Sequence, residues 1–563
     1  MAVILAVIYF IGKPMAEQVS FSREQVDLHT FFGLTNEEDA PVILGDTRAS
    51  LNAKVFDGVV YWDALNIAKV IDERFYRNQE DGCVLFTTAD ETVRVNFGQS
   101  FYTTHAEVMP VIEPVQVDLG HTIARNEDGR LYLALDFVKR YANFSYEVFA
   151  APDRVQIYAK DFDYVSASAL KKTALRANSD RKSGVLRSLD AGERVFVLTP
   201  LGDWTKVRTC DALIGFVETR QLSETSENHY VIENTYIDPP YTDVVRDYPI
   251  CLGWNQLTVY DANQYLADYL AGADPMNVIS PTWYTITDGE GGVTSIASKA
   301  YVDQAHARGL EVWPLVDDFT EGLDRHGLLS RAESRGALIS FLISQCEELG
   351  LDGINIDFEV VPADDGAHFT QFLREFSVAM RARGLVFSID NYPPRAHTEH
   401  YNRRVQGEVA DYVIIMGYDE HWGSSSGAGS VASLPFVRDA IERTLAQDVP
   451  ARKTINAVPF YTRIWTTLHA DGSVSATAVG QQSQADWIAK RELEPIWDDV
   501  LGQHYTQIDE NKATKQVWLE DADSMRVRLE IMKSYDLAGV ACWRLGLEND
   551  AQWSEIAAYL TQP

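Results

Sequence analysis

Side chains with oxygen atoms alternate with apolar side chains in LDGINIDFEVV, residues 351–361. Alternate residues of a strand point to the same face and lie about 7 Å apart. Asn355, Asp357 and Glu359 would therefore share one face, and the other face would carry Ile354, Ile356 and Phe358. The flanking segments are predicted helices that pack on the apolar face, so the polar face must be buried or line a cavity. Because burying carboxylates is costly, Asp357 and Glu359 are candidates for acid–base chemistry.

Strands alternate with predicted helices from about residue 228 to the end of the chain. We expect strands at residues 256–259, 278–280, 311–316, 353–359, 386–390, 412–418, 454–459 and 539–545. Helices are expected between them, for example at 300–309, 337–350, 365–384 and 434–446. This pattern predicts an α/β fold, a (β/α)8 TIM barrel, with an insertion at about 464–516 between the seventh and eighth strands. Active sites of this fold lie at the C-terminal ends of the strands, where Glu359 would end the fourth.

The composition limits the classes of partner. A chain of 563 residues indicates two to four domains. The formal net charge of −33 argues against nucleic acid or an anionic lipid surface as the main partner, because phosphate binding requires a basic surface. The five cysteines are far apart and form neither a disulfide framework nor a metal-ligand pattern. We therefore expect no cofactor and no metal.

Residues 36–162 contain a weak internal repeat. GVVYWDALNIAKVIDERFYRN begins at Gly58, and the similar GRLYLALDFVKRYANFSYEVF begins at Gly129. Each copy predicts a strand followed by a short amphipathic helix, so an α+β domain is expected. It resembles the stalk domains related to the N-terminal domain of copper amine oxidases, without their copper or quinone site. The resemblance implies a spacer or a wall-contact module.

Residues 165–225 predict a small all-β domain, with short strands separated by Gly and Asp turns. The runs Gly202-Asp203-Trp204 and Gly215-Phe216-Val217 resemble those of bacterial SH3 domains. Such domains commonly contact cell-wall glycan or peptide, so the resemblance implies binding to the cell wall through the N-terminal modules. The barrel would then occupy residues 228–563.

Residues 2–11 form a short apolar run. The run is too short for a membrane span of about 20 residues and lacks a basic n-region. We interpret residues 1–35 as a truncated signal or membrane anchor followed by a linker, with an ordinary strand as the alternative reading of the apolar run. The expected location is extracytoplasmic, either secreted or anchored at the bacterial cell surface.

The run from Asp352 to Glu359 resembles the motif Asp-Gly-x-Asp-x-Asp-x-Glu of glycoside hydrolase family 18. Further segments agree with the family in the expected order: VIIMGYDEHW on the sixth strand, NAVPFYTR on the seventh and VACWRLG on the eighth. DEHWGSSSGAGSVASLPFV, from Asp419, is similar to the bacterial branch that includes spore-germination and cortex-lytic N-acetylglucosaminidases. Asn355 departs from the motif, which usually has Asp there. This branch often has Asn, so we expect an altered pH profile and not a loss of activity.

The resemblance implies a retaining, substrate-assisted glycosidase, in which the acetamido oxygen of the substrate attacks its own anomeric carbon. Glu359 would be the general acid and later the base, Asp357 would bond the acetamide N–H, and Tyr418 would hold the acetamide oxygen. Supporting roles are implied for Asp352, Asn355, Asp419 and Met416. Contacts with the sugar are expected from Trp543, Trp283, Tyr392, Trp422, Tyr461 and Arg463.

The expected substrate is the β-1,4 linkage after N-acetylglucosamine in peptidoglycan or its fragments, because wall-type modules precede the barrel. Chitin or chitooligosaccharide is the alternative substrate. A non-catalytic protein that binds cell-wall glycan is an alternative of another class, and the presence of Glu359 argues against it. A purely structural wall anchor would leave the carboxylates unexplained. A calcium loop is disfavoured by Ile356 and Phe358 and by the absence of the required glycine.

Overall fold

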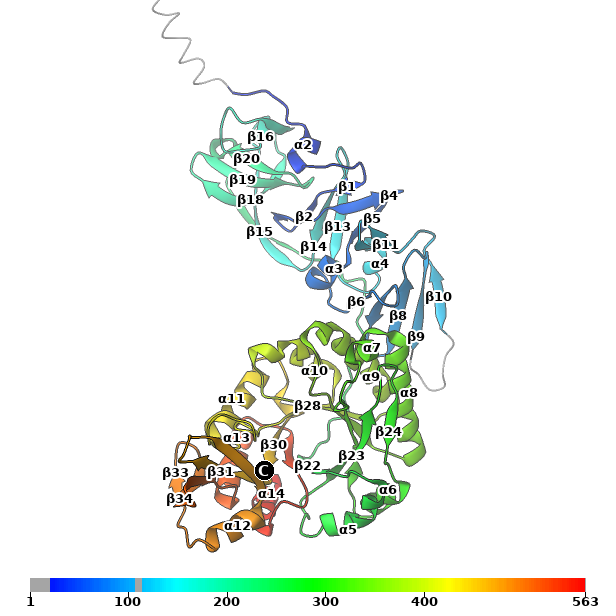
Figure 1. Ribbon diagram of the computed structural model, residues 1–563. Helices are drawn as coiled ribbons and strands as arrows, with labels where there is room; N and C mark the ends of the chain where they lie inside the picture. Colours follow the sequence, from blue (N-terminus) through cyan, green and yellow to red (C-terminus); the bar gives the residue numbers. More distant parts are fainter. Residues whose placement is uncertain (1–20, 107–113, 562–563) are drawn as a thin grey trace, which may run out of the picture.

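The computed structural model describes residues 21–106 and 114–561. Figure 1 shows the N-terminal modules in a row that leads from the all-β domain through an α+β region to the barrel. Among the described residues, none of the helices has the length and apolar character required to cross a bilayer. The expected signal or anchor at residues 2–11 lies outside the described part of the chain.

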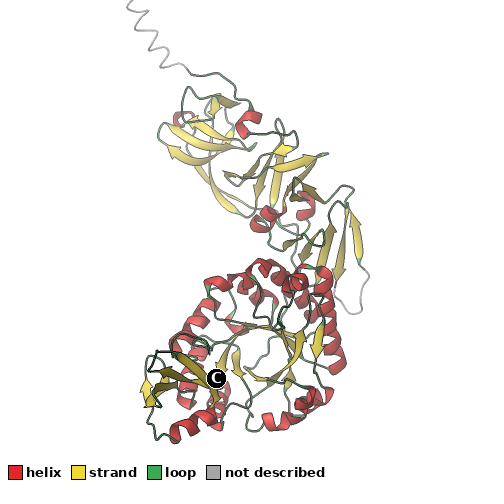
Figure 2. Cartoon of the chain, in the orientation of Figure 1, coloured by secondary structure: helices red, strands yellow, loops and turns green. Residues whose placement is uncertain are grey.

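Eight parallel strand positions form a closed barrel, and this confirms the predicted fold. The strands are β22 (Ile250–Asn255), β23 (Val278–Ile286), β25 (Glu311–Val312) with β26 (Leu315–Asp317), β27 (Gly353–Asp357), β28 (Val386–Asn391), β29 (Tyr412–Ile415), β30 (Thr454–Pro459) and β36 (Gly539–Trp543). The first strand, β22, pairs with both β36 and β23, which closes the ring. Figure 2 shows this ring of strands enclosed by helices.

The surrounding helices bury the outward-facing side chains of the strands. They are α5 (Leu266–Tyr269), α6 (Lys299–His306), α7 (Arg325–Ser330), α8 (Ala332–Leu349), α9 (Gly366–Arg381), α10 (Arg403–Val409), α11 (Leu434–Leu445), α13 (Ala522–Ser534) and α14 (Asp550–Thr561). Ile354 and Ile356 of β27 belong to this outer core. Phe358 stacks on Phe372 of α9 with ring centroids 5.6 Å apart. The apolar face predicted for residues 351–361 is therefore real.

Several expected strand boundaries were wrong: the second strand extends to Ile286, the eighth ends at Trp543, and three others bear directly on the site. The first strand covers Ile250–Asn255 and not 256–259, because the buried run ICLGWN forms the sheet and Gln256 begins the loop that follows. The fourth strand ends at Asp357, so Glu359 lies in the loop beyond it. The sixth ends at Ile415, before Met416 and Tyr418. In each case the chain leaves the sheet where its residues reach the C-terminal rim of the barrel.

The predicted insertion between the seventh and eighth strands forms a sheet of its own. It contains β31 (Tyr461–Leu468), β32 (Val474–Gly480), β33 (Ile496–Asp498), β34 (Gln503–Glu510) and β35 (Ala513–Trp518), together with α12 (Gln481–Ala489). The strand order is β32-β31-β35-β34-β33, and every pairing is antiparallel. The sheet therefore begins directly after the last residues of β30 and stands beside the rim.

The α+β module contains the predicted repeat. The first copy places β5 (Val59–Asp63) before α3 (Ala64–Val70), and the second places β12 (Arg130–Ala134) before α4 (Leu135–Val138). The two strands pair antiparallel, with Leu133 opposite Trp62. The other strands are β1 (Asp39–Ala40), β2 (Val42–Leu44), β3 (Thr47–Arg48), β4 (Ala53–Phe56), β6 (Phe75–Asn78), β7 (Cys83–Thr87), β8 (Glu91–Asn96), β9 (Phe101–Ala106), β10 (Val115–Asp118), β11 (Ala124–Glu127), β13 (Ser145–Phe149) and β14 (Arg154–Tyr158).

The all-β domain is a seven-stranded sheet that extends beyond the expected 165–225. Its strands are β15 (Phe162–Ser168), β16 (Thr173–Arg176), β17 (Val185–Leu189), β18 (Arg194–Leu201), β19 (Trp204–Thr209), β20 (Ile214–Glu218) and β21 (Ser226–Tyr230). Residues 21–35 were expected to be a linker, but they pack on this sheet. The backbone N–H of Val26 donates to the carbonyl of Val185 over 2.9 Å, and Leu28 and Phe32 of α2 (Leu28–Phe32) contact its core. Apolar side chains in this segment explain the packing.

The α+β module contacts the barrel directly. Arg374 of α9 forms an ion pair of 2.7 Å with Glu73. The backbone N–H of Ala332 donates to Asp81 over 2.7 Å, and the side chain of Gln371 donates to Thr87 over 2.9 Å. These bonds attach the module to the helices that follow β26 and β27.

Candidate active site

A cleft of about 720 Å³ opens at the C-terminal ends of the barrel strands. Its walls combine aromatic rings with carboxyl groups, the combination expected where a sugar face stacks on a ring and polar groups fix its orientation. The lining residues are Trp254, Gln256, Leu315, Phe319, Asp357, Glu359, Asp390, Tyr392, Pro393, Arg395, His397, Thr398, Met416, Tyr418, Asp419, Glu420, Trp422, Phe436 and Trp543.

Glu359 is held at the rim by its own backbone and by a tyrosine. Its backbone N–H donates to Oδ1 of Asp318 over 3.0 Å, and Asp318 in turn accepts from Arg325 over 2.8 Å. The hydroxyl of Tyr392 donates to the Glu359 carboxylate. Burial raises the pKa of Glu359, the Tyr392 hydrogen bond lowers it, and Asp318 and other nearby acids raise it further. A carboxyl with a raised pKa can be protonated when the substrate arrives, as a general acid must be.

Asp357 is buried at the last position of β27, with a side chain directed into the barrel. Its Oδ1 atom has no hydrogen-bond partner among the described residues. Burial, together with the neighbouring Asp390 and Glu359, raises its pKa well above the usual range. An unpartnered buried oxygen carries a free-energy cost, so Asp357 is poised to bond a group that enters the cleft.

Asn355 joins four strands beneath these carboxyls. Its Oδ1 accepts from Nε1 of Trp254 over 3.0 Å and from the hydroxyl of Ser280 over 3.5 Å. Its Nδ2 donates to Ser388 over 3.1 Å and to Oδ1 of Asp390 over 2.9 Å. The amide of Asn355 thus bonds the carboxyl of Asp390 and not that of Asp357. It therefore supports the second buried acid, on β28.

Tyr418 and Asp419 occupy the wall that follows β29. Burial raises the pKa of Tyr418 well above its usual value, so its hydroxyl remains a proton donor. Asp419 accepts from the hydroxyl of Tyr461 over 2.6 Å and from Arg463 over 2.8 Å. These two residues, from β31, fix the orientation of Asp419 at the cleft.

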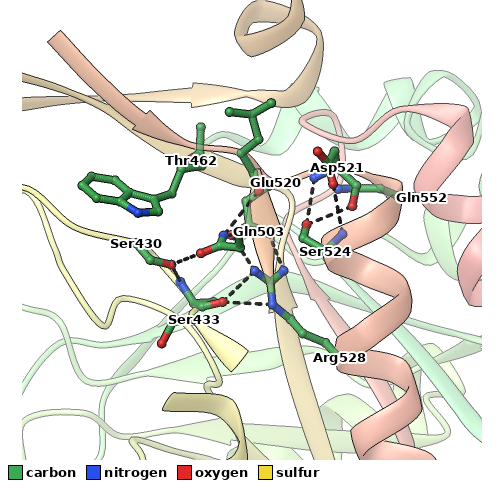
Figure 3. A network of polar contacts seen from close by, with 12 residues as sticks. Ser430, Ser433, Thr462, Gln503, Glu520, Asp521, Ser524, Arg528 and Gln552 are labelled. Atoms are coloured by element: carbon green, nitrogen blue, oxygen red, sulfur yellow. Dashed lines mark hydrogen bonds and ion pairs between the residues drawn. The ribbon is translucent and has the colours of Figure 1, made fainter. Parts of the chain in front are cut away.

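The loop that follows Asp419 is anchored to the insertion by a buried polar network, shown in Figure 3. Arg528 pairs with Glu520 and also donates to the carbonyl of Ala432 over 3.0 Å through Nε. Gln503 donates to Glu520 over 2.8 Å and accepts from the hydroxyl of Ser430. Burial raises the pKa of Glu520 to about 7 even with Arg528 beside it. The network links the cleft wall at residues 419–433 to the sheet of the insertion.

Most of the predicted site residues meet at the cleft. Glu359, Asp357, Tyr418, Asp419, Met416, Tyr392, Trp422 and Trp543 line it. Tyr461 and Arg463 are not part of the cleft lining, but both donate hydrogen bonds to Asp419, which is. Trp543 packs edge to face against Trp254, with ring centroids 5.8 Å apart.

Two predicted site residues lie elsewhere. Trp283 was expected to contact sugar, but it is buried between the strands and the helices, where its Nε1 donates to Asn263 over 2.9 Å. Asp352 precedes β27 at the opposite end of the barrel, and it accepts from the backbone N–H of Val312 and from His306, both over 2.8 Å. Both positions follow from the barrel geometry. The outward face of its strand places Trp283 in the layer under the helices, and a position before its strand places Asp352 at the N-terminal end of the barrel.

Sequence reasoning missed several lining residues. Asp390 is the penultimate residue of β28 and lies beside the other buried acids, so its position near a strand end was the available signal. Trp254 belongs to the strand whose boundary was predicted too late. Phe319, Arg395 and His397 lie in loops that have no periodic pattern.

Comparisons with known proteins agree with this geometry. The chain is 30% identical over 235 residues to the cortical fragment-lytic enzyme of Bacillus subtilis, a match that covers 40% of this chain and 54% of the relative. It is 24% identical over 296 residues to the uncharacterized glycosylase YvbX of the same organism, covering 50% and 84%. The chain spans about half the length of the first relatives it matches.

A solved structure has the same barrel. The crystal structure of the Bacillus cereus spore cortex-lytic enzyme SleL superposes with a TM-score of 0.51 at 20% identity, covering 56% of this chain and 74% of that one. Residues 317–548 match the family described as glycosyl hydrolases family 18. This match includes Asp357, Glu359 and Tyr418, and the chain therefore carries a glycosyl hydrolases family 18 domain.

Proposed function

We propose that the protein is a retaining, substrate-assisted glycosidase that cleaves β-1,4 linkages after N-acetylglucosamine in peptidoglycan or its fragments. The observation that carries the proposal is the pair formed by Glu359 and Asp357. Glu359 is the more accessible acid and has a raised pKa, whereas Asp357 is buried, has an unpartnered oxygen and has a pKa raised well above the usual range.

The roles follow from this difference. Glu359 protonates the glycosidic oxygen that leaves and later accepts a proton from water. A buried acid that favours its protonated form is a poor carboxylate nucleophile, so Asp357 is unsuited to form a glycosyl–enzyme bond. The acetamido oxygen of the sugar attacks the anomeric carbon instead. Asp357 accepts from the acetamide N–H through its unpartnered oxygen, and Tyr418 donates to the acetamide oxygen.

The chemistry of the cleft supports a neutral glycan. Trp543, Trp254 and Trp422 offer ring faces or edges to sugar, while Asp419 and Arg395 offer polar contacts. The formal net charge of −33 disfavours nucleic acids and other phosphate polymers as substrates. The relatives named for cortical fragments and the preceding β-rich modules favour peptidoglycan, with chitooligosaccharide as the alternative substrate. We propose an extracytoplasmic location, secreted or anchored at the cell surface by a segment upstream, with the modules in contact with the wall.

The test compares wild type, Glu359→Gln and Glu321→Gln on purified peptidoglycan and on chitooligosaccharides, with products identified by mass spectrometry. Glu321 is an exposed residue of the loop after β26 and serves as the matched control. General acid catalysis contributes about 10²- to 10⁴-fold. We therefore expect a loss of that size in Glu359→Gln alone, with new N-acetylglucosamine reducing ends only from active proteins.

The outcomes separate the alternatives. Hydrolysis of chitooligosaccharide but not of peptidoglycan would favour the second substrate. Saturable glycan binding without hydrolysis by wild type would identify a glycan-binding protein instead. A thiazoline analogue of the cyclised intermediate should inhibit an active enzyme, and a failure to inhibit would contradict substrate assistance.

A further inference from the structure

Two histidines and an aspartate gather on the barrel surface that faces the α+β module. They are His326 of α7, Asp365 of the short helix η3 (Ala363–Asp365) and His368 of α9. One potential metal-ligand atom from each lies within 4.8 Å of the others. The opposing module adds Glu80, whose Oε1 is 3.9 Å from Nε2 of His326, and Tyr76, whose hydroxyl contacts Nδ1 of His368.

Each ring can offer one nitrogen to an ion. Nδ1 of His326 lies 2.6 Å from Oδ1 of Asp365, so an ion that replaces the proton between them would bind both atoms. Nδ1 of His368 is occupied by Tyr76, which leaves Nε2 of His368 as its ligand atom. Nε2 of His326 then carries a proton on the side of Glu80. A histidine that binds a metal commonly bonds an oxygen through its second ring nitrogen, which fixes the ring and its tautomer.

We propose that His326, Asp365 and His368 form a site for a divalent transition metal such as Zn²⁺, with Glu80 of the α+β module orienting His326 through its other ring nitrogen. Two imidazoles with carboxylates suit zinc. Calcium and magnesium prefer oxygen ligands alone. Zinc–ligand bonds of about 2.0–2.2 Å place tetrahedral ligand atoms about 3.4 Å apart. The His326–Asp365 pair, now 2.6 Å apart, must therefore open by about 0.8 Å, and the wider pairs must close by about 1.5 Å or less. The side chain of His326 is 57% exposed, so an ion can reach it from solvent.

The site would join two parts of the molecule. His326 follows Arg325, which bonds Asp318, and Asp318 accepts from the backbone N–H of Glu359. Asp365 lies six positions after Glu359 in the loop that leaves β27. A bound ion would therefore fasten the α+β module to the loop that carries the proposed general acid.

A second group provides an internal control. His504, Asp521 and Asp523 also place ligand atoms within 4.8 Å. Their carboxylates are already engaged, because Asp521 caps α13 through the N–H of Ser524 over 3.0 Å and Asp523 pairs with Arg526 over 2.9 Å. We therefore expect no tight metal binding at this group.

The experiment titrates the full, chelator-treated chain with Zn²⁺ by calorimetry and with Co²⁺ by visible absorption. The proteins are wild type, His326→Ala, His368→Gln and the control His504→Ala. One ion should bind wild type and the control with equal affinity. Each of the other variants should bind at least about tenfold more weakly. Zinc should also raise the Tm of wild type and the control but not of the other two.

The metal-free Tm shows whether a variant is folded before its affinity is compared. The Glu80→Gln variant adds a test that leaves the barrel residues intact, and it should also weaken binding. The absence of saturable binding by wild type would overturn the proposal. Binding that survives in both His326→Ala and His368→Gln, or that is lost only in His504→Ala, would overturn it equally.

Discussion

Asn355→Asp should make the stability of the protein depend on pH through one buried carboxyl. Asn355 is 0% exposed, and its Nδ2 donates to Oδ1 of Asp390 over 2.9 Å. The substitution replaces that donor with an oxygen, so two carboxyls would face each other at hydrogen-bond distance. Burial and the like charge both raise the pKa of the new carboxyl, and the pair can hold one proton but not easily lose both.

The direction and size of this pH effect on stability follow from the difference between the pKa values in the folded and unfolded states. An unfolded aspartate has a pKa of about 3.9, and the pKa in the folded state is higher, so the folded state binds more protons in the interval between the two. The free energy of unfolding then falls as pH rises, by about 1.4 kcal/mol per pH unit, until pH exceeds the pKa of the folded state. Between about pH 5 and about pH 8 the loss would reach at most about 4 kcal/mol.

Chemical denaturation across this pH range measures the effect, with Asn355→Ala as the matched control. The alanine variant also loses the amide but adds no titrating group, so the difference between the two variants isolates the new carboxyl. The double variant Asn355→Asp/Asp390→Asn exchanges the two groups and restores a donor, and it should recover part of the loss. A difference between the single variants that stays constant with pH would refute the reasoning.

Three further perturbations test other parts of the site. Tyr392→Phe removes a hydrogen bond that lowers the pKa of Glu359. Because Glu359 must be protonated to act as the acid, the alkaline limb of the pH profile of kcat/KM should move to higher pH. A limb that stays in place would contradict the role assigned to Glu359. Arg528→Met leaves Glu520 buried without its partner and should cost about 3–5 kcal/mol in chemical denaturation, partly recovered in Arg528→Met/Glu520→Gln. Trp422 is 53% exposed at the cleft and should contribute only stacking on the sugar. Trp422→Ala should therefore raise KM by up to about tenfold, with kcat and Tm unchanged. An unchanged KM would show that no sugar stacks on Trp422.

The repeated alternation of apolar runs and amphipathic segments was enough to predict the barrel, because parallel strands buried on both faces and helices buried on one face have different periods. The predicted insertion and the paired repeat units around Trp62 and Leu133 had local patterns of the same kind. Strand ends were harder to predict. The alternation continues to Glu359, yet the sheet ends at Asp357, since hydrogen bonding to the neighbouring strands stops at the rim.

The residue types around the fourth strand, with their spacing, determined which acids could do chemistry. The segment that follows the sixth strand and the end of the eighth strand supplied Tyr418 and Trp543. Only the tertiary structure decided their partners. It directs the amide of Asn355 to Asp390, buries Trp283 in the outer core and places Asp352 at the far end of the barrel. It also brings Glu80 to His326, 246 positions apart in the chain. A sequence pattern records the period and burial of each element, whereas contacts between elements depend on how the closed barrel and the docked module bring distant residues together.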